Sequence, residues 1–232
     1  MRTLILLFFY VIIVVLAIPV FIFCYIVKRP NLLLFLGKAA MGLSKIILGI
    51  QLEVQGLEHV DRKKQYVFMA NHLSFIDGPL LFLLIPQQIR VIIKIGIVRI
   101  PIVGPIMKYA GFVPVDRKGI KSGRKSIDYA SKLIKEKGYS FLIFPEGTRS
   151  RDGKLHEFRR GGFFLALNSQ TPIVPITIKG TYDLMPKGSF FIKRGKIFVI
   201  FHEPVSVKGF EQQNLPELVT NVRNVIKSGL SD

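Results

Sequence analysis

The chain has 232 residues, half of them hydrophobic, and carries a formal net charge of +18. Its length suits one ordinary domain with an additional segment. Its single cysteine excludes an intrachain disulfide and a cysteine metal cluster. So large a positive charge predicts a polyanionic partner, and nucleic acid and anionic lipid headgroups are the two candidates.

An apolar segment opens the chain: Leu4–Val27 is 24 residues long and has no charged side chain. As a helix it would span roughly 36 Å, enough to cross a hydrocarbon core of about 30 Å. A cleaved signal peptide is the alternative, but no small-residue cleavage site follows Val27. We therefore expect a membrane anchor. Lys28 and Arg29 place the basic excess on its C-terminal side, which predicts that the remaining chain faces the cytosol.

A second apolar stretch, Asn31–Val54, is interrupted by glycine and lysine. This pattern favours an interfacial helix over a second membrane span, and a re-entrant hairpin of both segments is the alternative. We expect residues 1–54 to form the anchor and residues 55–232 to form one domain, because no repeat or linker follows. The anchor favours a membrane location, the plasma or inner membrane in a bacterium. It also favours anionic membrane lipid over nucleic acid, for which no zinc-finger or RNA-recognition pattern is present.

Short β-rich apolar runs alternate with helical patterns along the rest of the chain. The runs are Tyr66–Ala70, Val91–Ile95, Phe112–Val115, Ser140–Phe144, Ile173–Ile178 and Lys196–Phe201. The helical patterns are Asp77–Ile85, Ser126–Lys137, Phe163–Asn168 and a segment that follows Pro216. This alternation predicts an α/β domain with a mixed, largely parallel central sheet flanked by helices. Ligands of such sheets gather at the carboxyl ends of the strands.

His72 and Asp77 follow the first of these runs, in the segment Asn71–Asp77 (NHLSFID). A histidine acts as a general base when a second group fixes its tautomer and stabilises the imidazolium, as a nearby carboxylate does. On this segment alone, a hydrogen-bonded surface pair is the more common interpretation of a histidine near an aspartate.

Cationic side chains follow three other runs. Pro145–Ser150 (PEGTRS) offers a glycine for close backbone approach, a hydroxyl and the forked guanidinium of Arg149, a combination that suits a phosphate. The alternative is a solvated turn with a surface ion pair between Glu146 and Arg149. Lys94 interrupts an apolar run, where its charge needs water or an anion. Arg117 is either a further cation of the site or an ordinary turn residue.

Taken in order, four segments resemble the conserved blocks of the glycerolipid acyltransferases, in particular the 1-acyl-sn-glycerol-3-phosphate (lysophosphatidic acid) acyltransferase family. The spacing His72-x4-Asp77 resembles the first block and Gly111–Arg117 (GFVPVDR) the second. Phe144–Ser150 (FPEGTRS) is similar to the third, and Val174–Gly180 (VPITIKG) to the fourth. The resemblance extends over residues from about 50 to 205 and implies the glycerolipid acyltransferase fold.

The resemblance implies transfer of a fatty acyl group from acyl-CoA or an acyl carrier protein thioester to the sn-2 hydroxyl of lysophosphatidic acid. The product would be phosphatidic acid, a phospholipid precursor, and no cofactor or metal would be required. His72 would be the general base and Asp77 would orient it. The residues implied to bind the glycerol phosphate are Glu146, Gly147, Thr148 and Arg149, with Lys94 and Arg117 as further contacts.

Two alternatives stay open. The chain could acylate another lysolipid, because cations favour a phosphate monoester without requiring one. It could also be a membrane-anchored basic protein that binds anionic lipid without catalysis, a role that does not require a His/Asp pair.

Overall fold

The computed structural model describes residues 8, 15, 18–19, 21–116, 120–189 and 191–231. The predicted apolar helix Leu4–Val27 therefore lies mostly outside the described residues, although residues 21–26 are helical. Cys24, within that helical stretch, is fully buried and is a free cysteine.

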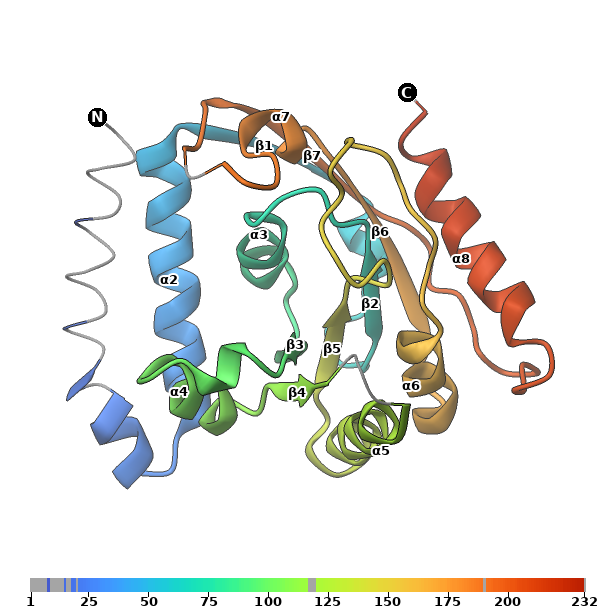
Figure 1. The fold of residues 1–232 in the computed structure, drawn as a ribbon, viewed down its shortest axis with the longest axis horizontal. Coiled ribbons are helices and arrows are strands. Elements are labelled where there is room, and N and C mark those ends of the chain that lie inside the picture. Colours follow the sequence, from blue (N-terminus) through green and yellow to red (C-terminus); the bar gives the residue numbers. More distant parts are fainter. Residues whose placement is uncertain are drawn as a thin grey trace.

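Helix α2 (Pro30–Leu48) is the first long element of the described chain (Figure 1). Proline occupies its first turn, where a missing N–H costs nothing, and Gly49 ends it with a left-handed φ of 65°. Within the described residues, α2 is one helix with the length and composition to cross a membrane, and 11 % of it is buried. Those two properties also fit a helix that lies along the membrane surface, so its interfacial location stays a prediction.

The prediction of a helix through Val54 is wrong at its end, because strand β1 occupies Ile50–Gln55. Apolar and polar residues alternate in this stretch (IQLEVQ), and that two-residue period fits a strand with one face against the protein. β1 pairs in parallel with β7 (Gly195–Phe201). Residues 50–54, expected to belong to the anchor, therefore lie in the sheet.

The described residues form a seven-stranded sheet in the order β1-β7-β6-β2-β5-β3-β4. Its other strands are β2 (Val67–Ala70), β3 (Ile89–Lys94), β4 (Val113–Val115), β5 (Ser140–Ile143) and β6 (Ile173–Lys179). The pairing of β6 with β7 is antiparallel, and the other named pairs are parallel. The predicted mixed, largely parallel sheet is therefore confirmed.

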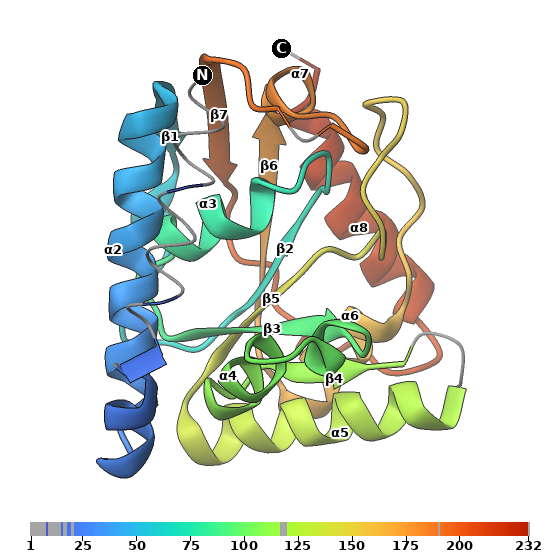
Figure 2. The same cartoon turned by 60° about the vertical axis from the view of Figure 1, so that its left-hand side comes forward.

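Strand β2 lies at the centre of the sheet, and its alternating side chains enter two separate cores. Val67 and Met69 pack with α5 (Ile120–Lys137), α6 (Gly161–Ser169) and α8 (Leu215–Ser228). Phe68 and Ala70 pack with α3 (Asp77–Leu84), against which α2 lies. Figures 1 and 2 show the resulting layers, with α2 and α3 on one face of the sheet and α5, α6 and α8 on the other. Burial on both faces explains why β2 is apolar throughout.

Shorter helices connect these layers. They are η1 (Leu57–His59), η2 (Ile97–Arg99), α4 (Val103–Tyr109) and α7 (Thr181–Leu184). Helix α5 begins six residues before the predicted start at Ser126. The sequence did not indicate this earlier start, because residues 121–125 have no apolar periodicity that would signal a helix.

The strand pairings bring several segments to one end of the sheet. Met69 pairs with Ile143, so His72 and Glu146, each three residues further on, lie at the same level. The amide of Asn71 donates to the carbonyl of Ile178 (2.9 Å) and accepts from its N–H (2.8 Å), which joins the end of β2 to β6. Polar side chains that are far apart in the sequence therefore meet at the carboxyl end of β2.

His202 makes stability depend on pH. Its Nε2 lies 2.8 Å from the Thr177 hydroxyl, which donates to the Ile226 carbonyl (2.8 Å). Burial, and then the charge of His59, lower the pKa of His202. The unfolded chain therefore takes up this proton at a higher pH than the folded chain, and stability is lost as pH falls from about 6.5 toward the lower folded value.

We expect the melting temperature of the wild type to fall more steeply between pH 7.5 and 5.5 than that of His202→Gln. The glutamine amide keeps a donor to Thr177 but binds no proton in this range. Thermal unfolding of both proteins in the same neutral detergent measures the difference, and equal pH slopes would contradict this assignment.

Candidate active site

His72 and Asp77 form a direct pair. Nδ1 of His72 lies 2.9 Å from Oδ2 of Asp77, with the histidine side chain 20 % exposed and the carboxylate fully buried. A carboxylate at Nδ1 fixes the proton on that nitrogen. Nε2 is then the nitrogen with a free lone pair, as a general base requires.

The position of Asp77 is set by backbone groups. Its Oδ2 also accepts hydrogen bonds from the N–H groups of Leu73 and Ser74, each at 2.7 Å. Asp77 is the first residue of α3, where the positive end of the helix dipole favours a carboxylate. Its Oδ1 is buried and has no hydrogen-bond partner. One carboxylate oxygen therefore holds both the loop backbone and the imidazole.

Phe144 fixes the plane of the imidazole. The rings of His72 and Phe144 are stacked, with centroids 4.0 Å apart and planes inclined by 18°. Phe144 directly follows β5, the neighbour of β2 in the sheet. The ring of His72 is therefore held by Asp77 at one edge and by Phe144 on one face.

Glu146 clamps the backbone beneath this pair. Its Oε1 accepts the N–H of His72 (2.7 Å), and its Oε2 accepts the N–H of His156 (3.0 Å). Only 4 % of the residue is exposed, and burial raises the pKa of the carboxyl while the two backbone donors oppose that change. The resemblance assigns Glu146 to the substrate phosphate, whereas this geometry supports a positioning role, because both oxygens are used within the protein.

A local turn holds the other end of the clamp. The Ser150 hydroxyl donates to Oδ1 of Asp152 (2.8 Å), and Nε2 of His156 lies 3.0 Å from the same oxygen. The N–H of Lys154, then the Ser150 hydroxyl, lower the pKa of Asp152 to about 2. Ser150 also donates its N–H to the carbonyl of His72 (2.8 Å). Residues 146–150 are thus tied to the backbone of His72 at two points, through the Glu146 carboxylate and the Ser150 N–H.

Gly147 is a position that only glycine fits. Its φ is 74°, in the left-handed region, and a Cβ there would lie 2.8 Å from Nε of Arg159. The backbone of this turn therefore comes close to a guanidinium, which adds a positive charge beside the turn. The predicted approach of a ligand to the Gly147 backbone stays a prediction.

Lys187 joins this turn and could not be identified from the sequence. Its Nζ donates to the Thr148 hydroxyl (2.9 Å) and to the carbonyl of Arg149 (3.0 Å). It lies in the loop after α7, nearly forty positions away along the chain and without a recognisable motif. The chain reversal between β6 and β7 brings it to the turn, so no local pattern signals it.

The remaining predicted residues are placed as follows. Thr148 is exposed, and Arg149 is half-buried. Lys94 is exposed at the end of β3, level with Pro145 because Val91 pairs with Leu142. Arg117 lies outside the described residues, so its part in the site stays a prediction. Among the residues that the structure describes, no group of three metal-ligating side chains gathers.

The comparisons with known proteins agree with this geometry. The family model described as "Acyltransferase" matches residues 51–179, a range that includes every residue of the site described above except Lys187. The solved 1-acyl-sn-glycerophosphate (LPA) acyltransferase PlsC from Thermotoga maritima superposes with a TM-score of 0.83 and 29 % identity. That likeness covers 98 % of this chain and 92 % of the solved one.

Sequence relatives have the same kind of name. A 1-acyl-sn-glycerol-3-phosphate acyltransferase from Borreliella burgdorferi is 30 % identical over 186 residues, 78 % of this chain and 74 % of the relative. One from Limnanthes douglasii is 33 % identical over 189 residues, 82 % of this chain. The chain spans 66 % of that protein, and 44 % of a chloroplastic relative from Brassica napus that is 39 % identical over 155 residues. With the matched family model covering more than half of its residues, the chain belongs to the acyltransferase family.

Proposed function

We propose that this protein transfers a fatty acyl group from a thioester to the free sn-2 hydroxyl of 1-acyl-sn-glycerol 3-phosphate, forming phosphatidic acid. The observation that carries the proposal is the pair of His72 and Asp77, whose 2.9 Å contact at Nδ1 leaves Nε2 free to accept a proton. The names of the relatives, which act on this acceptor, support the choice of substrate.

In the proposed reaction, Nε2 of His72 takes the proton of the acceptor hydroxyl as its oxygen attacks the thioester carbonyl. The tetrahedral intermediate collapses, the carbon–sulfur bond breaks, and the imidazolium returns the proton to the leaving thiolate. Asp77 stabilises the imidazolium between these two steps. No acyl-enzyme forms, because the acceptor oxygen is itself the nucleophile.

Cations beside the turn after β5 suit the phosphate of the acceptor. Lys187 already bonds the Thr148 hydroxyl and the Arg149 carbonyl, and the Arg159 guanidinium lies against Gly147. A phosphate monoester has up to two negative charges, and charge-assisted hydrogen bonds to it are stronger than neutral ones. We assign the phosphate to Thr148, Arg149 and Lys187, with Lys94 and Arg117 as outer contacts, and leave Glu146 as the clamp.

The acyl donor is either acyl-CoA or an acyl carrier protein thioester, and no further cofactor enters the scheme. Because the acceptor and the product are lipids, we place the protein at a membrane, with the domain on its cytosolic face. The exposed apolar residues of α2 and the net charge of +18 support contact with anionic membrane lipid.

An acceptor panel tests the proposal. Purified full-length protein is given each donor type with lysophosphatidic acid, lysophosphatidylglycerol or lysophosphatidylcholine, and radiolabelled diacyl product is measured. We expect the highest kcat/KM with lysophosphatidic acid. A higher value with another acceptor would reassign the substrate, and no turnover with any acceptor and either donor would favour a lipid-binding role without catalysis.

Lys187 offers a separate prediction on the phosphate. Lys187→Gln removes one charge-assisted contact, so we expect KM for lysophosphatidic acid to rise roughly tenfold while kcat changes less. Steady-state kinetics at saturating donor measures both constants. Lys208→Gln, which removes an exposed charge outside the site, is the control and should retain the wild-type KM. An unchanged KM in Lys187→Gln would remove the residue from the phosphate site.

A further inference from the structure

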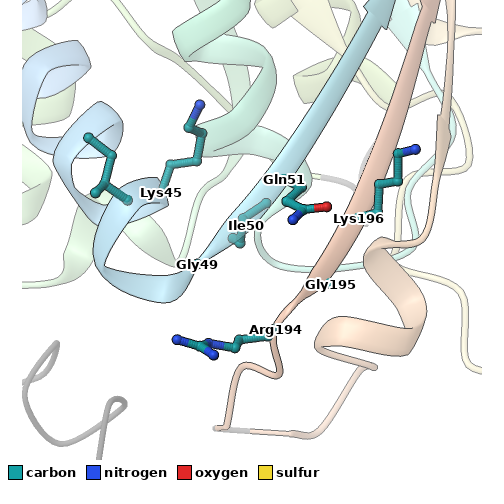
Figure 3. A pocket seen from close by; sticks show the side chains of 8 residues that line it. Lys45, Gly49, Ile50, Gln51, Arg194, Gly195 and Lys196 are labelled. Carbon is teal, nitrogen blue, oxygen red and sulfur yellow. The ribbon is translucent and has the colours of Figure 1, made fainter.

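A basic pocket of about 610 Å³, whose lining does not include His72, lies where the end of α2 meets the first residues of β1 and β7 (Figure 3). Its polar lining comes from Lys45, Gln51, Arg194 and Lys196. Figure 3 shows Lys45 and Arg194 on either side of the turn at Gly49. The catalytic scheme above uses none of these residues.

The pocket has an uncompensated positive charge. Three of its eight lining residues are cationic and none is acidic. Lys196 pairs with Glu53 at 2.5 Å and lies 4.8 Å from the centre of the Phe198 ring, so its charge is largely compensated. Lys45 and Arg194 remain as two cations. The C-terminal dipole of α2, equivalent to roughly −0.5 charge, offsets only part of them.

An apolar stripe on α2 leads to this pocket. Exposed apolar residues recur every three or four positions and so occupy one face of the helix. They are Leu32, Phe35, Leu36, Ala39, Leu43 and Ile46. Ile46, which is 71 % exposed, is itself part of the pocket lining. A cationic pocket at the end of an exposed apolar stripe has the two chemistries of a phospholipid, an anionic headgroup beside acyl chains.

The pocket also adjoins the segment that supports the active site. Lys179, the last residue of β6, pairs with Phe198, so the start of β7 lies at the same end of the sheet as His72. The loop between these strands contacts the catalytic region through Lys187 and through the Met185 carbonyl, which accepts the Ser74 hydroxyl (2.7 Å). Arg194 ends that loop, immediately before β7.

We propose that the basic pocket with Lys45 and Arg194 binds the anionic headgroup of a membrane phospholipid, at a site separate from the one that holds the acceptor. The lipid would lie with its acyl chains along the stripe on α2. It would thereby hold the loop before β7 next to the membrane.

Direct binding tests this proposal without any assay of catalysis. Full-length protein in neutral detergent micelles is titrated with dioctanoyl phosphatidylglycerol or dioctanoyl phosphatidylcholine by calorimetry. We expect tighter binding of the anionic lipid, and a loss of roughly 30-fold in that affinity in Lys45→Gln/Arg194→Gln, since each cation near an anionic lipid surface contributes about fivefold. Arg194→Lys keeps the charge and should keep most of the affinity.

A matched control separates the pocket from net charge. Lys135→Gln/Lys137→Gln also removes two exposed cations, at the far end of α5, and should bind as the wild type does. If the affinity for phosphatidylglycerol fell equally in both double variants, or in neither, the proposed lipid site would be wrong. Should the double variant in the pocket fail to fold, as judged by circular dichroism, Arg194→Gln alone must still weaken binding, and unchanged affinity there would overturn the site.

Two further titrations exclude other occupants. Coenzyme A is titrated in the same micelles, and loss of its affinity in the pocket variant, with phosphatidylglycerol binding unchanged, would reassign the pocket to the donor. The KM for lysophosphatidic acid, a readout that rests on the proposed function, should stay within about twofold in the pocket variant. If this KM rose as much as the affinity for phosphatidylglycerol fell, the pocket would be part of the acceptor site, and the proposal of a separate site would be wrong.

Discussion

His72→Ala is expected to lower kcat by roughly 10²–10⁴-fold, because a general base contributes about that much to a proton transfer. The variant retains the clamp of Glu146 on the residue 72 backbone N–H, since that bond does not involve the side chain. Acyl transfer to lysophosphatidic acid, measured at saturating substrates, gives the effect.

The controls for His72→Ala are folding and membrane association. The contacts of the imidazole that bear on folding are its hydrogen bond with Asp77 and its stacking on Phe144. Circular dichroism and sedimentation with membranes should match the wild type. Unchanged turnover in a folded variant would remove His72 from the mechanism.

Asp77→Asn is expected to lower kcat by about 10²-fold or more, because it removes the carboxylate charge while the histidine keeps its tautomer. Two backbone donors, from Leu73 and Ser74, face Oδ2 of Asp77 at 2.7 Å. The asparagine must therefore place its oxygen there, which keeps the hydrogen bond from His72 and the same tautomer. What is lost is the negative charge that stabilises the imidazolium. In a Ser-His-Asp triad, where the same change also gives the wrong tautomer, the loss is about 10⁴-fold.

The same substitution should also lower stability. The asparagine NH₂ takes the place of Oδ1, which is buried and has no hydrogen-bond partner. This oxygen is already unsatisfied in the wild type, so the loss comes from Oδ2, whose three hydrogen bonds are no longer charge-assisted, and the melting temperature should fall. Asp77→Ala is the comparison, because it leaves two backbone N–H groups unsatisfied and should lose more stability. A fully active Asp77→Asn enzyme would show that the carboxylate charge has no part in the reaction.

Chemistry that lies within one short segment could be predicted from the sequence. Asp77 is five residues after His72, and the turn between them is short enough that the two side chains can meet. The sheet was predictable for a similar reason. A strand buried on both faces, such as β2, is apolar throughout, and that pattern is local.

Strand β1 was missed although it has a local pattern, and the role of Glu146 had no local signal. β1 was hidden because Asn31–Val54 is apolar overall, and the change from a helical to a two-residue period comes only after Gly49. From the sequence, Glu146 was interpreted as part of a surface ion pair or as a substrate contact, since no local pattern reveals that its side chain is buried. The pairing of β2 with β5 places it beneath His72, where its two oxygens meet backbone donors from segments ten and 74 residues away.

The sequence by itself therefore determined the fold class, the pairing of His72 with Asp77 as a candidate base and orienting carboxylate, and a turn that suits a phosphate. Only the tertiary structure decided that Glu146 binds the backbone N–H of His72, that Lys187 joins the turn, and that Lys45 and Arg194 line one pocket. The physical reason is the separation along the chain. Each of these contacts depends on the strand order, in particular on the antiparallel return of β7 beside β6, which no local periodicity specifies.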